Sequence, residues 1–533
     1  MNIYDLSGIL YGMDISALTT TNDIEKLRAM ALAMVQKAMS ENAEKERELQ
    51  DKSQRIQLLE EMLKLVRQQR FGKKCETLAG MQRSLFEEDV DADIAEITAQ
   101  LDKLLPPSVE EDDKASRSRP VRKPLPSHLP RVEKVIPPAT DHCPECNEPL
   151  HHIRDAVSEK LEYIPARFVV NRYVRPQYSC PCCQKVFSGE MPAHILPKSA
   201  VEPSVIAQVV INKYCDHAPL YRQNNIFARA DVDLPESTLS DMVGVAGAAL
   251  SPLAELLHRE LLTRGVIHAD ETGMRILDTK KGGKSCSGYL WAYVSGERSG
   301  SQIVCFDCQP GRGHEYPENW LQGWSGDLVV DGHKAYRTLA GKTPGITLAG
   351  CWSYARRGFA DLYKMNKEPR AAIAVKKIAG LYRLEKKIRH RPAEKIRQWR
   401  QRYARPILEE LWSWLEEQEQ RCPPGGALYK AIVYALSRRA ELSLFLEDGA
   451  VPLDNNVCER AIKTVVMGRK SWHFAGSRMA GERAARIMGL LETAKLNGLE
   501  PHAWLTDVLN RLPLWPEDRL EEPLPLPGFT FSA

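Results

Sequence analysis

The sequence predicts a multidomain α+β protein in which an α/β domain, built on a mixed sheet, is interrupted by a helical insertion. Three observations support this fold class. The chain has 533 residues, which is enough for several domains. Short β-rich segments replace helical periodicity from residue 264 onward, and helices return after them. Two C-x-x-C pairs precede the helical regions next to this domain and indicate a small separate module.

The overall composition is that of a globular protein, since 43% of the residues are hydrophobic and 27% are charged. The formal net charge of +3 is nearly balanced, so any nucleic-acid-binding surface has to be local. No apolar run approaches the roughly 20 residues that a membrane helix needs. The amino terminus lacks the layout of a secretory signal. We therefore expect a cytoplasmic protein with reduced cysteines and no membrane partner.

The first predicted region, residues 1–85, is dominated by one long helix over residues 22–70. Its apolar residues recur at three-then-four spacing in two stretches that are four residues out of step, which is a stutter in a coiled coil. These residues are Ile24, Leu27, Ala31, Met34 and Ala38, then Leu49, Ile56, Leu59, Leu63 and Val66. Two interpretations stay open, a dimerising coiled coil or a helix packed on its own domain. Residues 86–140 are charged and rich in proline, which predicts a linker.

A zinc-binding module is predicted over residues 141–198. Each C-x-x-C pair suits a tight knuckle, and four thiolates form a tetrahedral set for Zn²⁺. The predicted ligands are Cys143, Cys146, Cys180 and Cys183, whereas Cys182 is interpreted as a bystander. Because the protein fills all four positions, this zinc is expected to be structural. The alternative is a set of buried free thiols.

Residues 199–263 are helical in pattern and contain a helix, a break and a second helix. We expect Ser237 and Thr238 to cap that second helix. A helix-turn-helix of this kind reads DNA in many proteins, but the same geometry is also common without DNA.

The α/β domain is predicted over residues 264–364 and 451–498. Three strands, a short helix, a fourth strand and a strand that passes into a helix follow one another, which indicates a mixed sheet. Cys305 and Cys308 lie in an apolar strand and are interpreted as core thiols. Residues 365–450 form a helical insertion whose many Lys and Arg residues either follow a phosphate backbone or are only solvated. Residues 499–533 form a C-terminal segment.

Three carboxylates are the candidate catalytic groups. Asp270 and Asp331 are expected to end two apolar strands, and Glu459 lies in a helix whose start Asp454 or Asn455 would cap. Each strand-end aspartate alone is weak evidence, because many strands end in aspartate to begin a turn. Convergent carboxylates suit Mg²⁺ or Mn²⁺, and two such ions clamp the attacking and leaving oxygens of a displacement at phosphorus.

Several neighbours of these acids are candidates for further roles. Arg460, Arg469 and Lys470 are predicted to bind DNA phosphates, with surface ion pairing as the alternative. His268 should face the same side of its strand as Asp270, whereas Glu271 should face away. For the tryptophans nearby, Trp352 and Trp472, core packing is favoured over base stacking.

The sequence resembles the transposases of the insertion sequence 66 family. The resemblance rests on HADET, GYLWAYVSG, VVDGHKAY, GCWSYARRGF, LDNNVCERAIKTVVMGRKSWHFAGS and GERAARIMGLLETAKLNGLEP, and it extends upstream to RFGKKCE, the cysteine pairs and APLYRQNNIFAR. It implies a ribonuclease H-like catalytic domain whose D-D-E triad is Asp270, Asp331 and Glu459. The chain departs from the family pattern at Tyr354, where histidine is usual, and at His333, where an aromatic residue is usual.

The resemblance also implies function and partners. It implies a bacterial DNA transposase, associated with the nucleoid when bound to DNA, that cleaves the 3′ ends of its element and joins them to target DNA. Its partners would be double-stranded DNA at terminal inverted repeats and target sites, further copies of itself, and accessory proteins of the same element. Two alternatives stay open: a zinc-containing DNA-binding regulator without catalysis, and a ribonuclease H-like nuclease without strand transfer.

Overall fold

The computed structural model describes residues 167–179, 186–196, 199–278, 284–298 and 300–532, together with scattered positions between 32 and 52. Those scattered positions are helical, but the predicted coiled coil, the linker and the four predicted zinc ligands lie largely or wholly outside the described residues. A separate unit of the chain includes two short described strands, β1 and β2, which pair antiparallel. Their bounds are Gln177–Ser179 and Val186–Ser188.

A mixed sheet forms the centre of the other unit, in the strand order β5-β4-β3-β6-β7. Three strands form an antiparallel meander, and the last two run parallel to the first of them. The bounds are β3 Val266–Asp278, β4 Lys284–Ser295, β5 Val304–Gln309, β6 Gly326–Val330 and β7 Ile346–Gly350. The predicted mixed α/β sheet is therefore confirmed.

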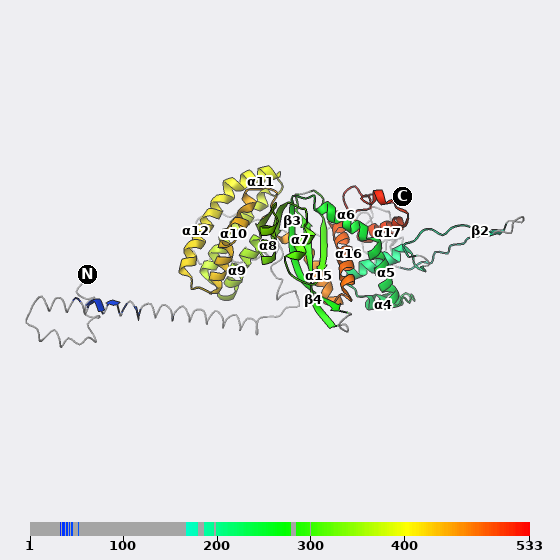
Figure 1. Ribbon diagram of the computed structural model, residues 1–533, viewed down its shortest axis with the longest axis horizontal. Helices are drawn as coiled ribbons and strands as arrows, with labels where there is room; N and C mark the ends of the chain where they lie inside the picture. Colours follow the sequence, from blue (N-terminus) through cyan, green and yellow to red (C-terminus); the bar gives the residue numbers. More distant parts are fainter. Residues whose placement is uncertain are drawn as a thin grey trace, which may run out of the picture. The chain divides into compact units, whose positions relative to one another are not determined.

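Helices cover the sheet because its residues alternate between two buried faces. On one face, Trp291 contacts Tyr336 of α8, and Tyr293 stacks on Trp320 of α7 with ring centroids 3.7 Å apart. The other face packs against α15 and α16, which Figure 1 draws in orange beside the strands. The bounds of these helices are α7 Glu315–Trp320, α8 Lys334–Lys342, α15 Asn456–Trp472 and α16 Arg478–Leu496.

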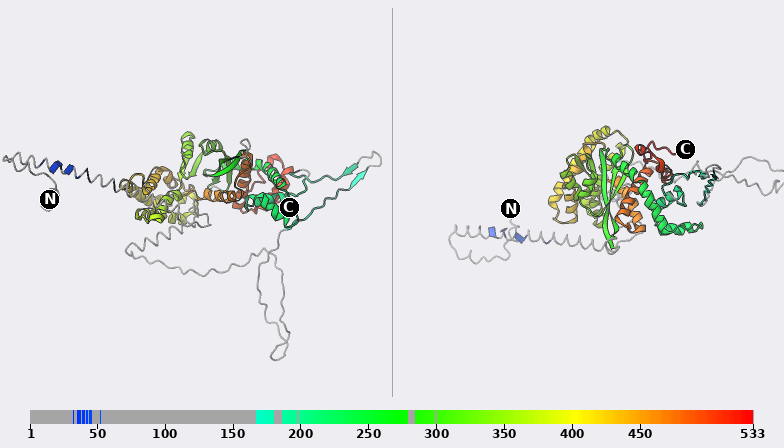
Figure 2. Two further views of the ribbon diagram at one scale, coloured as in Figure 1. Left: turned by 90° about the horizontal axis from the view of Figure 1, so that it is seen from below. Right: turned by 45° about the vertical axis from the view of Figure 1, so that its right-hand side comes forward.

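The helical insertion leaves the sheet through α9, which follows β7 directly. Figures 1 and 2 show its helices gathered on one side of the sheet, with α16 on the other side. A π-helical turn over Arg400–Ala404 joins two of them just before Pro406, which has no backbone N–H for the helical ladder. The bounds are α9 Trp352–Asn366, α10 Pro369–Ile388, α11 Ala393–Trp399, α12 Arg405–Arg421, α13 Ala427–Leu436 and α14 Arg439–Ser443.

The helices that precede the sheet confirm the helical pattern of residues 199–263 but not its predicted cap. The second helix of the helix-break-helix pattern, α5, begins at Glu236, and its N-cap residue is Pro235. Ser237 and Thr238 lie inside its first turn, so the capping prediction is wrong. Pro235 fixes the backbone for the helix start, and Glu236 complements the positive helix end. The bounds are α3 Pro203–Tyr214, α4 Leu220–Ala228, α5 Glu236–Ala249 and α6 Ser251–Leu261.

The C-terminal segment packs onto this helical group through α17, Pro501–Arg511, which contacts α3. Trp504 is buried there, and its indole N–H donates to the carbonyl of Pro523 at 3.2 Å. None of the described helices alone is long and apolar enough to cross a membrane, although the bent pair α5–α6 has sufficient length and apolar composition.

Candidate active site

The two candidate aspartates lie on neighbouring parallel strands. β3 pairs with β6 from Val266, opposite Asp327, to His268, opposite Val329. Continuing this register by two residues brings Asp270 beside Asp331, which directly follows β6. Strands this close are about 4.8 Å apart. The prediction that Asp270 ends its strand is wrong, because β3 continues to Asp278 as a hairpin with β4.

The helix that carries Glu459 is tied to β3 by one asparagine. The Asn455 side chain contacts His268 Nδ1 through its Oδ1 at 2.8 Å, and its Nδ2 donates to the Ala269 carbonyl at 2.9 Å. Asn455 occupies the N-cap position of α15 but its side chain makes no cap hydrogen bond, so the prediction that Asp454 or Asn455 caps this helix holds for Asp454. Asp454 Oδ1 accepts the backbone N–H of Asn456 at 3.1 Å.

The surroundings of Asp270 and Glu459 favour the protonated forms of these two acids. Burial of its carboxyl group raises the pKa of Asp270 well above the ordinary value, and neighbouring carboxylates raise that pKa further: Asp331, Glu271 and Glu459 in decreasing order. Burial likewise raises the pKa of Glu459 to about 8, an effect that the nearby guanidinium of Arg357 opposes. The three acids, whose cluster is called the crevice below, are therefore close enough for their charges to interact, which is the electrostatic condition that attracts a cation.

The three acids offer the oxygen ligands that divalent ions prefer, but their side chains do not converge closely. Glu459 is buried, and its Oε2 has no hydrogen-bond partner, whereas its Oε1 lies 3.9 Å from Arg357 Nη2. Asp270 and Asp331 are both partly exposed at the mouth of the crevice. Among the described residues, no three His, Cys, Asp or Glu side chains converge closely enough to count as a metal-ligand group. The carboxylate oxygens present are nonetheless the hard ligands that Mg²⁺ and Mn²⁺ prefer.

The turn that presents Asp331 is held by the helical insertion. Gly332 has a φ of +91°, and a Cβ there would lie 2.3 Å from Arg438 Nε, so the turn requires glycine. Arg438 Nη2 donates to the Gly332 carbonyl at 3.0 Å, and the Tyr434 hydroxyl donates to the Asp331 carbonyl. The Arg438 guanidinium also lies over the Tyr434 ring, 4.0 Å from its centroid. The chain thus fixes the backbone of Asp331 while its carboxylate stays accessible.

On the opposite face of β3, the carboxylate of Glu271 is paired with a cation. Glu271 forms an ion pair with Arg312, and its Oε2 accepts a hydrogen bond from the Tyr336 hydroxyl at 2.8 Å. His333, one of the departures from the family pattern, donates its backbone N–H to Asp331 Oδ1 at 2.9 Å and precedes α8. Glu271 therefore has partners of its own on the side away from Asn455, as the strand alternation predicted.

The three predicted DNA-binding cations have different surroundings. Arg460 forms a surface pair with Glu297 at 3.2 Å. Arg469 is half-buried and donates to the Thr272 hydroxyl at 2.9 Å, whereas Lys470 is exposed. Their role in binding DNA stays a prediction. Of the two tryptophans, Trp352 is buried in the core as expected, with its indole N–H donating to the carbonyl of Leu442 at 2.8 Å, and Trp472 is partly exposed.

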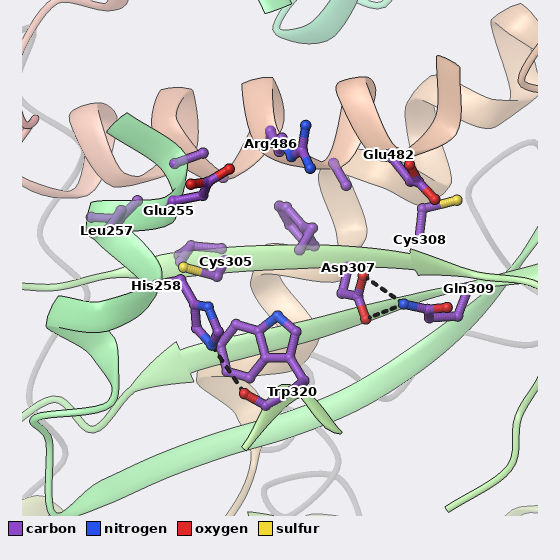
Figure 3. Close-up of a pocket in the computed structure, with 15 residues that line it drawn as sticks. Glu255, Leu257, His258, Cys305, Asp307, Cys308, Gln309, Trp320, Glu482 and Arg486 are labelled. Atoms are coloured by element: carbon purple, nitrogen blue, oxygen red, sulfur yellow. Dashed lines mark hydrogen bonds between the residues drawn. The ribbon is translucent and has the colours of Figure 1, made fainter. Parts of the chain in front are cut away.

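A separate cavity of about 340 Å³ lies at the outer edge of the sheet, between α6, β5 and α16 (Figure 3). Its Asp307 accepts two hydrogen bonds from Gln309, at 3.0 and 2.9 Å, and burial raises the pKa of this carboxyl group. The two core thiols predicted in this strand, Cys305 and Cys308, are buried. None of the three candidate acids lines the cavity, so Asp307 is an acid of the same sheet outside the crevice.

Four family models match the chain, and together they define an insertion-sequence transposase. The model described as the transposase IS66 family covers residues 198–483, more than half of the chain. The chain belongs to this family. The other three are described as a zinc-finger binding domain of transposase IS66, a transposase C of IS166 homeodomain, and an IS66 C-terminal element. They cover residues 140–184, 58–133 and 489–526. The zinc-finger match contains all four predicted zinc ligands.

Several curated proteins are similar to this chain over long or short stretches. The uncharacterized protein y4hP of Sinorhizobium fredii is 32% identical over 487 residues, which cover 88% of this chain and 87% of the relative. The uncharacterized protein y4qI of the same organism is 31% identical over 530 residues, covering 95% and 97%. The uncharacterized protein YjgZ of Escherichia coli is 82% identical over 33 residues, covering 6% of this chain and 30% of that protein.

Sequence reasoning missed the residues that position the acids. Asn455 was visible as a helix-start residue, but its contacts with β3 depend on a strand 186 residues earlier. Tyr434 and Arg438 lie in an insertion whose basic residues all look alike in the sequence. The one available signal was Asp331-Gly332, because an aspartate-glycine turn after a buried strand implies a backbone that needs support.

Proposed function

We propose that this chain is a D-D-E transposase that cleaves the 3′ ends of its element and transfers them to target DNA in a metal-dependent reaction. The proposal is supported by Asp270, Asp331 and Glu459, from two strands and one helix, because they lie close enough for the charges of Asp331 and Glu459 to raise the pKa of Asp270. Structural networks usually neutralise their acids, as Arg312 does for Glu271 on the opposite face. Within the described residues, the one ion pair of these three acids is the 3.9 Å contact between Glu459 and Arg357.

The strand order supports a ribonuclease H-like catalytic domain. A three-stranded antiparallel meander continued by two parallel strands is the arrangement expected for that fold, and the helical insertion precedes the helix that bears the third acid. On this basis the proposed catalytic domain comprises residues 264–364 and 451–498, with residues 365–450 as the insertion.

The proposed site residues have separate roles. Asp270, Asp331 and Glu459 would hold two Mg²⁺ or Mn²⁺ ions, which when bound supply an activated oxygen nucleophile and charge stabilisation for the departing oxygen. Asn455 orients the helix of Glu459 against β3, and the Tyr434–Arg438 pair holds the turn of Asp331. Arg460, Arg469 and Lys470 would bind phosphates. The sites outside the crevice, including a structural zinc on Cys143, Cys146, Cys180 and Cys183, are proposed to support binding of the element ends.

The proposal is tested with end-containing DNA and each acid neutralised in turn. Asp270→Asn, Asp331→Asn and Glu459→Gln should each lower metal-dependent cleavage by at least about a thousandfold, because each removes a charge that a two-metal site needs. The matched control is Asp307→Asn, which removes a buried acid of the same sheet outside the crevice and should leave the cleavage rate within about threefold of the parent.

The remaining outcomes separate the alternatives. Binding of the ends without cleavage at any metal concentration would favour a DNA-binding regulator. Cleavage without joined product from pre-cleaved ends would favour a nuclease that lacks strand transfer. Equal losses in Asp307→Asn and the three crevice variants would contradict the proposed site.

A further inference from the structure

The hairpin of β3 and β4 extends beyond the end of β6 and carries a hollow of its own. β6 last pairs with β3 at His268, whereas the pairing of β3 with β4 continues to the end of β3. The hollow has a volume of about 350 Å³. Its lining consists of residues 273–275 and 287–289 of the hairpin, together with Arg469 and His473 from the end of α15. The same strand and helix therefore carry Asp270 and Glu459 at one end and this hollow at the other.

The charge of the hollow is opposite to that of the carboxylate crevice. Its described lining contains two arginines and no carboxylate. Arg275 is exposed, and the contacts of the half-buried Arg469 are with neutral groups, the Thr272 hydroxyl and the Gly273 carbonyl. Burial lowers the pKa of Arg469. Because none of the described residues places a carboxylate beside it, this half-buried guanidinium favours a bound anion, and phosphate suits its planar fork.

A glycine keeps the hollow open. Gly273 lies opposite Tyr289 in the β3–β4 register, so the missing side chain leaves room beside an aromatic ring. A Cβ at Gly273 would meet nothing within 4 Å, and its φ lies outside the positive region. The partly exposed Tyr289 is a flat surface on which a sugar or base can stack. The same geometry makes Gly273 a position where a larger side chain fills the hollow without a backbone clash.

A strained turn brings His473 to the hollow. Its φ of 60° and ψ of −43° differ from the usual left-handed helical region. The backbone N–H of Phe474 donates to the carbonyl of Trp472 at 2.7 Å, which closes a γ-turn of the rare, strained kind. Such backbone is energetically costly and persists where the surroundings hold it. Ala475 does so here, because its backbone pairs with the free edge of β3.

The distance from the acids matches a short length of DNA. Along β3 from Asp270 to Gly273 and Arg275, which by strand alternation lie on the Glu271 face, the strand advances roughly 10 to 16 Å at about 3.3 Å per residue. One nucleotide step advances about 3.4 Å along duplex DNA. We infer that the hollow binds a backbone phosphate of the DNA strand three to five nucleotides from the scissile phosphate, with Tyr289 beneath the adjoining nucleoside. This inference rests on the proposed function, because it takes the crevice as the place of cleavage.

The test measures binding of a fluorescein-labelled 30-base-pair element-end duplex to the full-length chain by fluorescence anisotropy, in magnesium-free buffer so that no cleavage occurs. Arg275→Gln should flatten the slope of log K against log salt concentration by about 0.9, the value for one phosphate contact. Gly273→Leu, which fills the hollow and leaves every cation in place, should weaken binding roughly tenfold. The matched control is Arg519→Gln, an exposed arginine that pairs with Glu522 in the C-terminal segment.

Each outcome bears on the hollow itself. Unchanged slope and affinity in both hairpin variants, with circular dichroism spectra like that of the parent chain, would overturn the inference. An equal change of slope in Arg519→Gln would also overturn it, because the effect would then be one of net charge. Asp270→Asn should bind the duplex with unchanged slope. Cleavage that survives Asp270→Asn would refute the proposed function, and the anisotropy result would still report on DNA at the hollow.

Discussion

The sheet and the helical insertion use buried polar groups in opposite ways. In the sheet, Asp270 and Glu459 have raised pKa values because burial and like charges disfavour their ionised forms. In the insertion, the buried Arg400 is fully satisfied: it forms a bidentate pair with Glu385 and donates to three backbone carbonyls. Those carbonyls belong to Phe445, Asp448 and Val451.

This difference assigns chemistry to one region and positioning to the other. Arg400 donates to the carbonyl of Val451, in the segment that leads from the insertion to α15. Tyr434 and Arg438 donate to the turn of Asp331. Two of the three acids therefore depend on the insertion for their backbone geometry. For the many Lys and Arg residues of the segment 365–450, the sequence left two interpretations open, contact with DNA and simple solvation. The exposed cations leave both open, but the buried polar contacts serve the sheet.

The largest expected effect is a pH dependence of the free energy of unfolding, which bound divalent metal ions should remove. The folded-state pKa of Glu459 is raised from its ordinary 4.5 to about 8, so between these values the folded chain holds a proton that the unfolded chain has lost. Unfolding then releases protons, and the free energy of unfolding falls as pH rises from about 5 to 8. At about 1.4 kcal/mol per pKa unit the loss is at most roughly 5 kcal/mol. Urea denaturation in magnesium-free buffer measures it.

Two controls sharpen this experiment. Glu459→Gln should remove the part of the pH dependence that Glu459 contributes, because the neutral amide cannot titrate, and should leave the part contributed by Asp270, whose pKa is also raised. Saturating Mg²⁺ should flatten the profile, since the ion favours the ionised carboxylates that burial disfavours. A parent protein whose stability rises between pH 5 and pH 8 in the absence of magnesium would contradict the electrostatic account of the crevice.

The next largest expected effect is a loss of stability when the buried Arg400 of the insertion is replaced. Arg400→Ala should lower the free energy of unfolding by about 3–5 kcal/mol, because it leaves Glu385 and three buried carbonyls without their donor. The matched control is Arg405→Ala, whose exposed pair with Glu447 at 2.9 Å should be worth less than about 1 kcal/mol. Urea midpoints measure both. Equal shifts would mean that the burial of Arg400 gives it no special structural role.

The sequence predicted the sheet better than the contacts that organise it. Strands such as 304–309 are short, apolar and bounded by turn residues, so their type follows from local pattern. Asp270 was assigned to a strand end because polar residues follow the apolar run. The register with β4 continues past it, and no local signal reports a partner strand. The contacts of Asn455 and Arg400 join segments separated by tens to nearly two hundred residues, and local periodicity carries no information on such pairs.

The smallest expected effect lies where the two regions meet. Tyr434→Phe removes the hydroxyl that donates to the Asp331 carbonyl and keeps the ring that stacks on Arg438. Loss of one such hydrogen bond costs about 1 kcal/mol. If the bond positions Asp331 for reaction, the cleavage rate should fall about fivefold while DNA affinity is unchanged. Tyr429→Phe, on the same helix α13, is the control and should alter neither quantity. A drop in stability with an unchanged cleavage rate would mean that Tyr434 supports only the insertion. Gly332 and Arg438 would then be the residues that position Asp331.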